Sequence, residues 1–242
     1  MKLIIIRHGD PDYEIDSLTP KGKTEAELLS QRLQKMTIDD IYCSPLGRAK
    51  RTAKPYIEAT GKEIKIVPWL EEFNYATVVD PENPDRRKQI WDFSQEFYAK
   101  TTMLHRVDEW YKTDFISNSN VKKAYDAVCN GLDEMLASHG YIRKNGYYAV
   151  EHGNHDTVVL FCHLGVEAVL LSHLLFTSPL IFSQGCCPLP TSVTNLVTEE
   201  RNKGIALFRC SSLGDLSHLY SADEPPAFAA RFCECYEDNT RH

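Results

Sequence analysis

The chain has 242 residues, of which 43% are hydrophobic and 25% are charged, and its formal net charge is -7. This composition predicts a soluble globular protein with one large core, or a core and a lid. The acidic balance argues against nucleic acid as the main partner, because binding of a phosphate backbone needs a basic face. No apolar run approaches the roughly 20 residues that cross a bilayer, so we expect no membrane partner.

The chain contains eight cysteines, and its opening residues lack the pattern of a secretory signal. Some of these cysteines lie in apolar runs, as Cys43 does, where a thiol behaves as a small hydrophobic group. We therefore expect reduced thiols and a cytoplasmic location. Neither the adjacent Cys186 and Cys187 nor the Cys233-x-Cys235 pair has the spacing of a zinc site, so we expect no metal and no cofactor.

The first apolar run of the chain, from Leu3 to Ile6, ends in Arg7-His8-Gly9. A short β-branched run of this kind predicts a buried strand, most simply in a parallel sheet. The carboxyl ends of such strands are where α/β sheets place their ligand crevices, and glycine leaves room for a ligand. The tripeptide alone could equally be a charged strand end that returns the chain to solvent.

The sequence predicts a helix and then a second strand after this tripeptide. Thr19 and Pro20 predict a helix N-cap and its first position, and a short strand is expected at residues 38–43. Ser44 ends that strand, and a second helix opens with Arg48 in its first turns. The free N–H groups and the positive dipole end of such a helix favour an anion. Arg48 could reach that anion, or it could be a surface side chain.

A third strand is expected at residues 64–67, and two adjacent carboxylates, Glu71 and Glu72, come shortly after it. They could be solvated loop charges, or they could supply a general acid to the same crevice. Residues 74–148 are then turn-rich at first and helical later, with a long helix expected at 120–139. We interpret this stretch as a largely helical insertion that forms a lid. Arg86 and Arg87 could meet a substrate from it, although solvated charges are the simpler interpretation.

The most strand-like run of the chain, residues 157–162, ends in His163-Leu164-Gly165 before an apolar helix. This repeats the order of strand, histidine and helix start seen after Ile6, although His163 could also be a hydrogen-bonded core histidine. The preceding stretch 151–156 could offer metal ligands, but a turn explains its Gly, Asn and Asp more simply. Paired strands at 191–197 and 205–210 and a short helix around 227–232 complete the pattern.

Four short motifs of the first part of the chain carry a resemblance to a known family. They are Arg7-His8-Gly9, Leu18-Thr19-x-x-Gly22, Ser44-Pro45-Leu46-x-Arg48-Ala49-x-x-Thr52-Ala53 and Leu70-Glu71-Glu72. In order and spacing they resemble the histidine phosphatase (phosphoglycerate mutase-like) superfamily, and the resemblance resumes near Thr157. It implies a single α/β domain over residues 1–242, built as a three-layer αβα sandwich with a mostly parallel central sheet flanked by helices.

The resemblance also implies roles for individual residues. His8 would be the nucleophile that forms a phosphohistidine without a metal, and Glu72, with Glu71 as second choice, would be the acid. The phosphoryl group would be bound by Arg7, Arg48, His163 and the backbone N–H of Leu164, while Tyr13 would border the substrate. In the family a glycine usually follows the second histidine directly, whereas Leu164 intervenes here. Neutral imidazole suits the nucleophile, because an anionic group would be repelled by a phosphomonoester.

Three functions remain open from the sequence. The first is a phosphatase that hydrolyses a small phosphorylated metabolite, the second is a phosphoglycerate-type mutase, and the third is a non-catalytic domain that binds phosphorylated ligands. The residues after Gly9 are Asp-Pro-Asp-Tyr and do not resemble the Glu-Ser-x-Trp-Asn run of the glycolytic mutases. This difference favours the phosphatase. No pattern in the sequence indicates the oligomeric state.

Overall fold

The structure, a computed structural model, describes residues 1–228 and 235–237, so most of the helix expected around 227–232 lies outside the described residues. Its centre is an eight-stranded sheet. The strands of this sheet are β1 (Lys2–Arg7), β4 (Asp40–Cys43), β5 (Lys65–Ile66), β8 (Tyr141–Lys144), β9 (Tyr147–Val150), β10 (Thr157–Cys162), β11 (Val193–Asn202) and β12 (Ile205–Asp215). They are ordered β5-β4-β10-β1-β11-β12-β9-β8 across the sheet.

The sheet is mixed but mostly parallel, as predicted. Strands β5, β4, β10 and β1 are parallel neighbours. Strands β11, β12, β9 and β8 are each antiparallel to the strand before them in this order. As a result, β11 and β9 run in one direction and the other six strands run in the opposite direction. The two strands expected near residues 191 and 205 are confirmed as the antiparallel pair β11 and β12.

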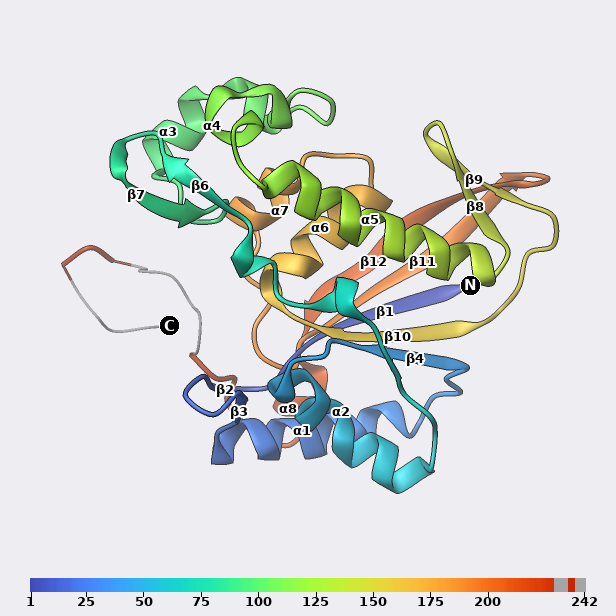
Figure 1. The fold of residues 1–242 in the computed structure, drawn as a ribbon. Coiled ribbons are helices and arrows are strands. Elements are labelled where there is room, and N and C mark those ends of the chain that lie inside the picture. The colour runs from blue at the N-terminus through green and yellow to red at the C-terminus, as the bar shows by residue number, and fades with distance from the viewer. Residues whose placement is uncertain (229–234, 238–242) are drawn as a thin grey trace.

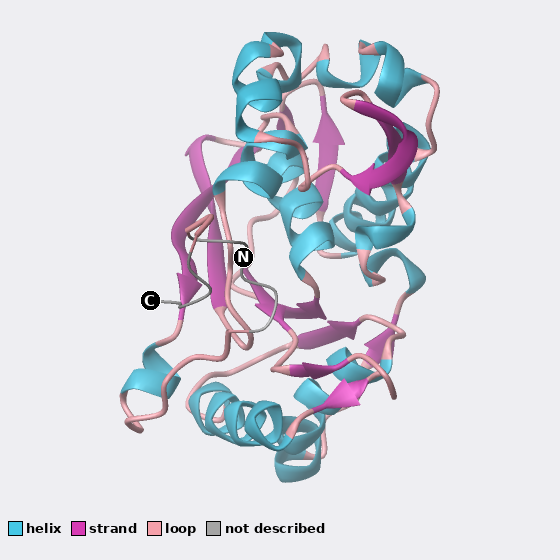
Figure 2. Cartoon of the chain, turned by 90° about the vertical axis from the view of Figure 1, so that its left-hand side faces the viewer, coloured by secondary structure: helices cyan, strands magenta, loops and turns pink. Residues whose placement is uncertain are grey.

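Helices cover both faces of the sheet, which confirms the three-layer architecture (Figures 1 and 2). One face carries α1 (Pro20–Leu33), α2 (Gly47–Thr60) and the short α8 (Ser217–Tyr220), and the other carries α5 (Val121–Ser138), α6 (Leu164–Leu174) and α7 (Pro179–Gly185). Thr19 caps α1 as predicted, because its side chain accepts from the Gly22 N–H. Within the described residues, no helix combines the length and the apolarity that crossing a membrane requires.

Strand β1 is buried on both sides, which explains its uninterrupted apolar run. Successive side chains of a strand face opposite sides of the sheet. Accordingly, Ile4 and Ile6 belong to the core under α1 and α2, while Leu3 and Ile5 belong to the larger core under α5 and α6. An alternating pattern would have indicated one solvent-facing side, and β1 has none.

The insertion contains more strand than the sequence predicted. Besides α5, it holds α3 (Gln95–Lys100), α4 (Asp114–Ser117), the 3-10 turns η2 (Phe73–Tyr75), η3 (Thr102–His105) and η4 (Trp110–Lys112), and a hairpin of β6 (Thr77–Asp80) and β7 (Asn83–Gln89). The hairpin was missed because β7 reads Asn-Pro-Asp-Arg-Arg-Lys-Gln, which has no apolar alternation. The long helix α5 packs on the sheet with its expected apolar face.

The carboxyl ends of the parallel strands meet at one edge of the sheet. In register, Arg7 of β1 lies beside Cys162 of β10, and Cys43 of β4 lies beside Phe161. The residues that follow these strands, namely His8, His163 and Ser44, are therefore brought side by side. This edge also faces the small hairpin of β2 (Pro11–Asp12) and β3 (Ser17–Leu18) (Figure 1).

Candidate active site

Two histidines form the centre of the candidate site. His8 follows β1, and His163 follows β10 as the N-cap residue of α6. Their ring centroids lie 5.0 Å apart, and the two residues are 1% and 0% exposed. The structure thus brings together the two histidines that the sequence singled out at two separate strand ends.

The His8 ring is held in the tautomer that a nucleophile needs. Its Nδ1 lies 2.8 Å from the carbonyl oxygen of Gly9, and since a carbonyl only accepts, Nδ1 carries the hydrogen. The lone pair is therefore on Nε2. Burial, with the neighbouring Arg7 charge as a second cause, lowers the pKa of His8 well below its usual value. His8 is a neutral imidazole with a free nucleophilic nitrogen.

Buried nitrogen atoms without partners surround this imidazole. Arg7 donates from Nη1 to the Pro188 carbonyl over 2.6 Å, and Arg48 donates from Nη1 to Asp16 over 2.8 Å. Within the described residues, however, the Nε atoms of both arginines and Nδ1 of His163 are buried and have no hydrogen-bond partner. Buried polar atoms are ordinarily paired. Three unpaired nitrogens from β1, α2 and the start of α6 fit the oxygens of a bound anion.

Asp16, which the sequence analysis did not single out, positions Arg48. Besides the 2.8 Å contact with the Arg48 guanidinium, its carboxylate accepts from the Gly47 N–H over 2.5 Å. It thereby caps α2 from a distant turn, since the local N-cap residue Leu46 provides no side-chain hydrogen bond. A Cβ atom on Gly47 would lie 2.1 Å from the Asp16 carbonyl oxygen, so only glycine permits this approach.

Replacing Asp16 by alanine should weaken both the helix start and phosphate binding. Loss of the cap is expected to lower the free energy of unfolding by about 1 kcal/mol. A freely rotating Arg48 should lower kcat/KM by roughly 10-fold, the equivalent of one modest hydrogen bond. Urea denaturation and steady-state kinetics measure the two effects, with Asp12→Ala in the same small hairpin as the control. Equal kinetics for the two variants would contradict a positioning role for Asp16.

The carboxylate of Glu72 reaches the site from the other side. Its Oε1 accepts from three backbone N–H groups, those of Phe73 at 2.7 Å, Gly165 at 3.0 Å and Val166 at 3.3 Å. Burial raises the pKa of Glu72, and the hydrogen bond from Phe73 only partly opposes this effect. The side chain of Glu71 is exposed. The geometry therefore favours Glu72 over Glu71 as the acid of this site.

The glycine at position 165 provides the space that Glu72 needs. A Cβ atom there would lie 2.7 Å from Oε1 of Glu72 and 2.3 Å from the indole of Trp91. The helix start therefore holds a carboxylate, and Leu164 is the first residue of α6, ahead of the two N–H groups that bind it. Trp91, which the sequence analysis did not single out, adds an apolar wall beside the acid.

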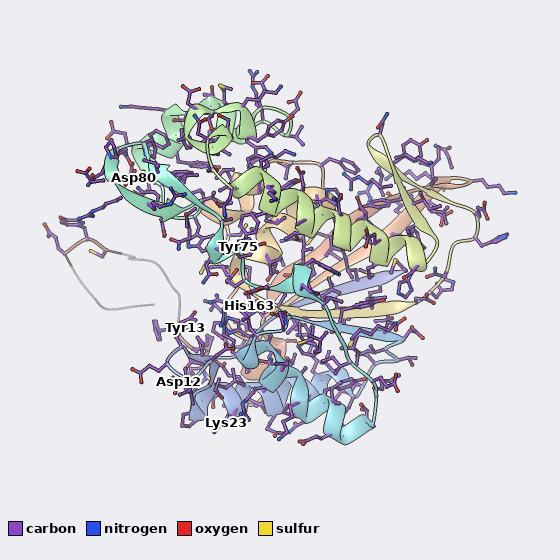
Figure 3. The ribbon with its side chains drawn as sticks, viewed as in Figure 1. Asp12, Tyr13, Lys23, Tyr75, Asp80 and His163 are labelled. Carbon is purple, nitrogen blue, oxygen red and sulfur yellow. The ribbon has the colours of Figure 1, made fainter. Side chains whose placement is uncertain are left out.

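The three residues expected to border the substrate lie in different places. Tyr13 stands 60% exposed, with its ring centroid 5.4 Å from the Arg48 guanidinium carbon. In the view of Figure 3, His163 lies between Tyr75 above and Tyr13 below to the left. Arg87 is used within the hairpin, where it donates to the side chain and carbonyl of Thr77. Arg86 is exposed on β7.

A second buried acid, Glu167, lies one turn into α6. Its Oε1 accepts from the Thr194 hydroxyl over 2.7 Å, while Oε2 is buried without a partner in the described residues. Burial raises the pKa of Glu167 to about 7, against the opposing influence of the hydrogen bond from Thr194 and the charge of Arg7. In the sequence, Glu167 stands out only as the one acidic residue of a mainly apolar helix.

Glu167 should make stability depend on pH. The pKa of Glu167 is about 7 in the folded protein and 4.5 as an ordinary glutamate. Its contribution to the free energy of unfolding is therefore fully present below pH 4.5 and is lost as the pH rises through 7. Glu167→Gln should therefore gain stability over the wild type between pH 5 and pH 8, by at most on the order of 3 kcal/mol. Urea denaturation at both pH values measures this, with the exposed Glu27→Gln as control. A difference that does not change with pH would contradict it.

The stretch 151–156 connects β9 to β10, as the turn interpretation predicted. His139 contacts the carboxylate of Asp156 there, with 2.9 Å between Nδ1 and Oδ2. Within residues 1–228 and 235–237, no group of three or more His, Cys, Asp or Glu side chains is placed to hold a metal ion.

A known protein family matches the part of the chain that contains His8. The family model of the histidine phosphatase superfamily (branch 1) matches residues 3–128, which is more than half of the chain. The chain belongs to this superfamily. The match covers the end of β1 followed by His8, the start of α2 that carries Arg48 and the loop that carries Glu72.

The individual relatives are only distantly similar to this chain in sequence. A protein named as a probable phosphatase of Schizosaccharomyces pombe is 25% identical over 237 residues, 92% of this chain and 97% of the relative. A probable phosphoglycerate mutase of Serratia proteamaculans is 31% identical over 108 residues, 38% of this chain and 50% of the relative. Among solved structures, a phosphoserine phosphatase variant of Entamoeba histolytica in complex with phosphoserine matches with a TM-score of 0.58 and 20% identity. The match covers 90% of this chain and 98% of the Entamoeba histolytica chain. The last likeness supports the fold.

Proposed function

We propose that the protein is a metal-independent phosphatase that hydrolyses a small phosphomonoester through a phosphohistidine intermediate on His8. The observation that carries this proposal is the set of unpaired buried nitrogens of Arg7, Arg48 and His163 around a neutral imidazole. A phosphoryl group spreads negative charge over three equatorial oxygens, and these nitrogens supply donors for it. Family membership supports the same chemistry.

The first half of the reaction transfers the phosphoryl group to His8. The lone pair of Nε2 forms a bond to phosphorus, while the bond from phosphorus to the ester oxygen breaks. Glu72 donates a proton to that oxygen, so the product leaves as an alcohol. The raised pKa of Glu72 favours its protonated form. Because Oε1 is occupied by backbone N–H groups, Oε2 is the oxygen that carries it.

The second half returns His8 to its starting state. The Glu72 carboxylate, now ionised, takes a proton from a water molecule as the water oxygen bonds to phosphorus. The bond between phosphorus and Nε2 breaks, inorganic phosphate leaves, and the acid has regained its proton. The charges of Arg7 and Arg48 stabilise the phosphoryl group in both halves without a metal ion.

The substrate proposed here is a small phosphorylated metabolite, in keeping with the phosphoserine bound by the Entamoeba histolytica structure. Its alcohol portion would lie between Tyr13 and Trp91, under a lid formed by residues 74–148. A mutase is the second candidate, since a relative with that name matches part of the chain. The residues after Gly9 favour the phosphatase, because Asp-Pro-Asp-Tyr does not resemble the Glu-Ser-x-Trp-Asn run of the glycolytic mutases. A cytoplasmic location is part of the proposal.

The test is to trap the phosphoenzyme and follow the acceptor of its phosphoryl group. An aryl phosphate is added in EDTA, the mixture is quenched rapidly, and the intact mass is measured. We expect one acid-labile phosphoryl group and continued phosphate release in EDTA. Adding a monophosphorylated diol then separates the two reactions, because a mutase would return the phosphoryl group to the second hydroxyl. Loss of turnover in EDTA would contradict the metal-independent mechanism.

A further inference from the structure

Within the described residues, Ser44 is the only hydrogen-bond partner of the two ring nitrogens of His163. Its hydroxyl oxygen lies 2.7 Å from Nε2 of His163, and both residues are 0% exposed. Ser44 follows directly on β4, and its backbone N–H donates to the Phe161 carbonyl of β10 over 2.9 Å. The sheet register thus fixes Ser44 and His163 relative to each other, as two adjacent strand ends.

The direction of this hydrogen bond follows from the other partner of Ser44. A hydroxyl has one hydrogen and two lone pairs. The Leu46 N–H donates to the Ser44 oxygen over 3.2 Å, which occupies one lone pair. The hydroxyl hydrogen needs an acceptor, and Nε2 of His163 is the acceptor within reach. The arrangement that satisfies every group has Ser44 donating to Nε2, so the ring hydrogen of His163 is on Nδ1.

The placement of this hydrogen decides whether His163 attracts or repels a phosphoryl group. Burial, with the positive charges of Arg48 and Arg7 as further causes, lowers the pKa of His163 well below its usual value. A neutral imidazole carries a single N–H. With the hydrogen on Nδ1, the buried atom without a protein partner is a donor, whereas with the hydrogen on Nε2 it would be a lone pair facing phosphoryl oxygens.

We propose that Ser44 is a positioning residue that fixes the tautomer of neutral His163, so that Nδ1–H donates to the phosphoryl group. This inference rests on the proposed function. His163 then donates as a neutral imidazole, without a second proton. The two histidines of the site then have opposite tautomers, because the nucleophile His8 needs a lone pair at the reacting nitrogen and the binding residue His163 needs a hydrogen.

The experiment reads the tautomer directly in the free enzyme. Long-range proton–nitrogen NMR correlations of protein labelled with nitrogen-15 in histidine distinguish Nδ1–H from Nε2–H. In the wild type His163 should show Nδ1–H. In Ser44→Ala the signal should move toward Nε2–H, and the inhibition constant of vanadate should rise about 10-fold or more, as expected for a lost hydrogen bond to a charged ligand. Ser44→Thr, which keeps the hydroxyl, should retain both properties.

Two controls separate positioning from structural damage. Ser172→Ala removes another buried hydroxyl, on α6, and should leave the tautomer and the vanadate inhibition constant unchanged. In a His163→Ala background, Ser44→Ala should add no further loss of vanadate binding. A wild-type signal from Nε2–H would overturn the proposal even if Ser44→Ala does not fold, and so would a shifted tautomer with unchanged vanadate binding. A missing phosphoenzyme would instead count against the proposed function, and the tautomer result would stand.

Discussion

His8→Ala should abolish turnover and the phosphoenzyme together. Without the imidazole, the arginines can still bind the phosphoryl group, but no nitrogen is present to accept it. We expect a loss on the order of 10⁵-fold or more in kcat, because covalent catalysis is removed and only electrostatic stabilisation is left. Vanadate or phosphate should still bind, which shows that the site is intact. Intact-mass measurement and steady-state kinetics provide the two readouts.

The buried position of His8 allows a sharper version of this experiment. Because the ring is 1% exposed, its removal leaves a cavity of the shape of imidazole within reach of Arg7 and Arg48. Added imidazole should fill that cavity, accept the phosphoryl group and restore part of the turnover. His163→Ala serves as the control and should not be rescued, since its ring binds rather than reacts. Undiminished turnover in His8→Ala would contradict the assignment of the nucleophile.

Glu72→Gln should slow the reaction in a way that depends on the leaving group. The acid is needed most when the alcohol is a poor leaving group, so an alkyl phosphate should lose on the order of 10²–10⁴-fold in kcat/KM. A p-nitrophenyl ester needs little protonation, so its first half-reaction should be nearly preserved. Its second half should slow, because no carboxylate activates the water. The variant should therefore release a burst of nitrophenol and accumulate phosphoenzyme.

Glu71→Gln is the matched control for this experiment, since it changes the adjacent carboxylate whose side chain is exposed. It should behave like the wild type with both esters. Rapid-mixing kinetics with each substrate measure the burst, and intact mass measures the phosphoenzyme. A leaving-group dependence in Glu71→Gln instead of Glu72→Gln would exchange the roles of the two residues.

The sequence was informative where the chemistry lies at strand ends. Arg7, His8 and His163 follow apolar runs, and the carboxyl ends of parallel strands share an edge of the sheet, so their proximity could be predicted without coordinates. The strand at residues 157–162 was predicted with the bounds it has in the structure. The preference for Glu72 over Glu71 came only from the resemblance, because the residues themselves do not show which carboxylate meets the N–H groups of α6.

The supporting residues were harder to predict because their partners come from distant elements. Asp16 lies in a polar turn and gives no signal until that turn packs on the start of α2. Trp91 was one aromatic residue among many in the insertion, and only the close approach to Gly165 gives it a place beside Glu72. Such contacts are set by tertiary packing, which neither periodicity nor short motifs contain.

The way the insertion packs constrains how this protein could acquire new substrates. Val78 and Ile90 of the hairpin region and Leu132 of α5 share one hydrophobic core with Leu3 and Ile5 of the central strand. Deleting or exchanging the whole insertion would therefore expose the catalytic sheet to water and unfold it, rather than uncover a working site. The exposed side chains of β7, at residues 84–87, can in contrast change without a cost to this core.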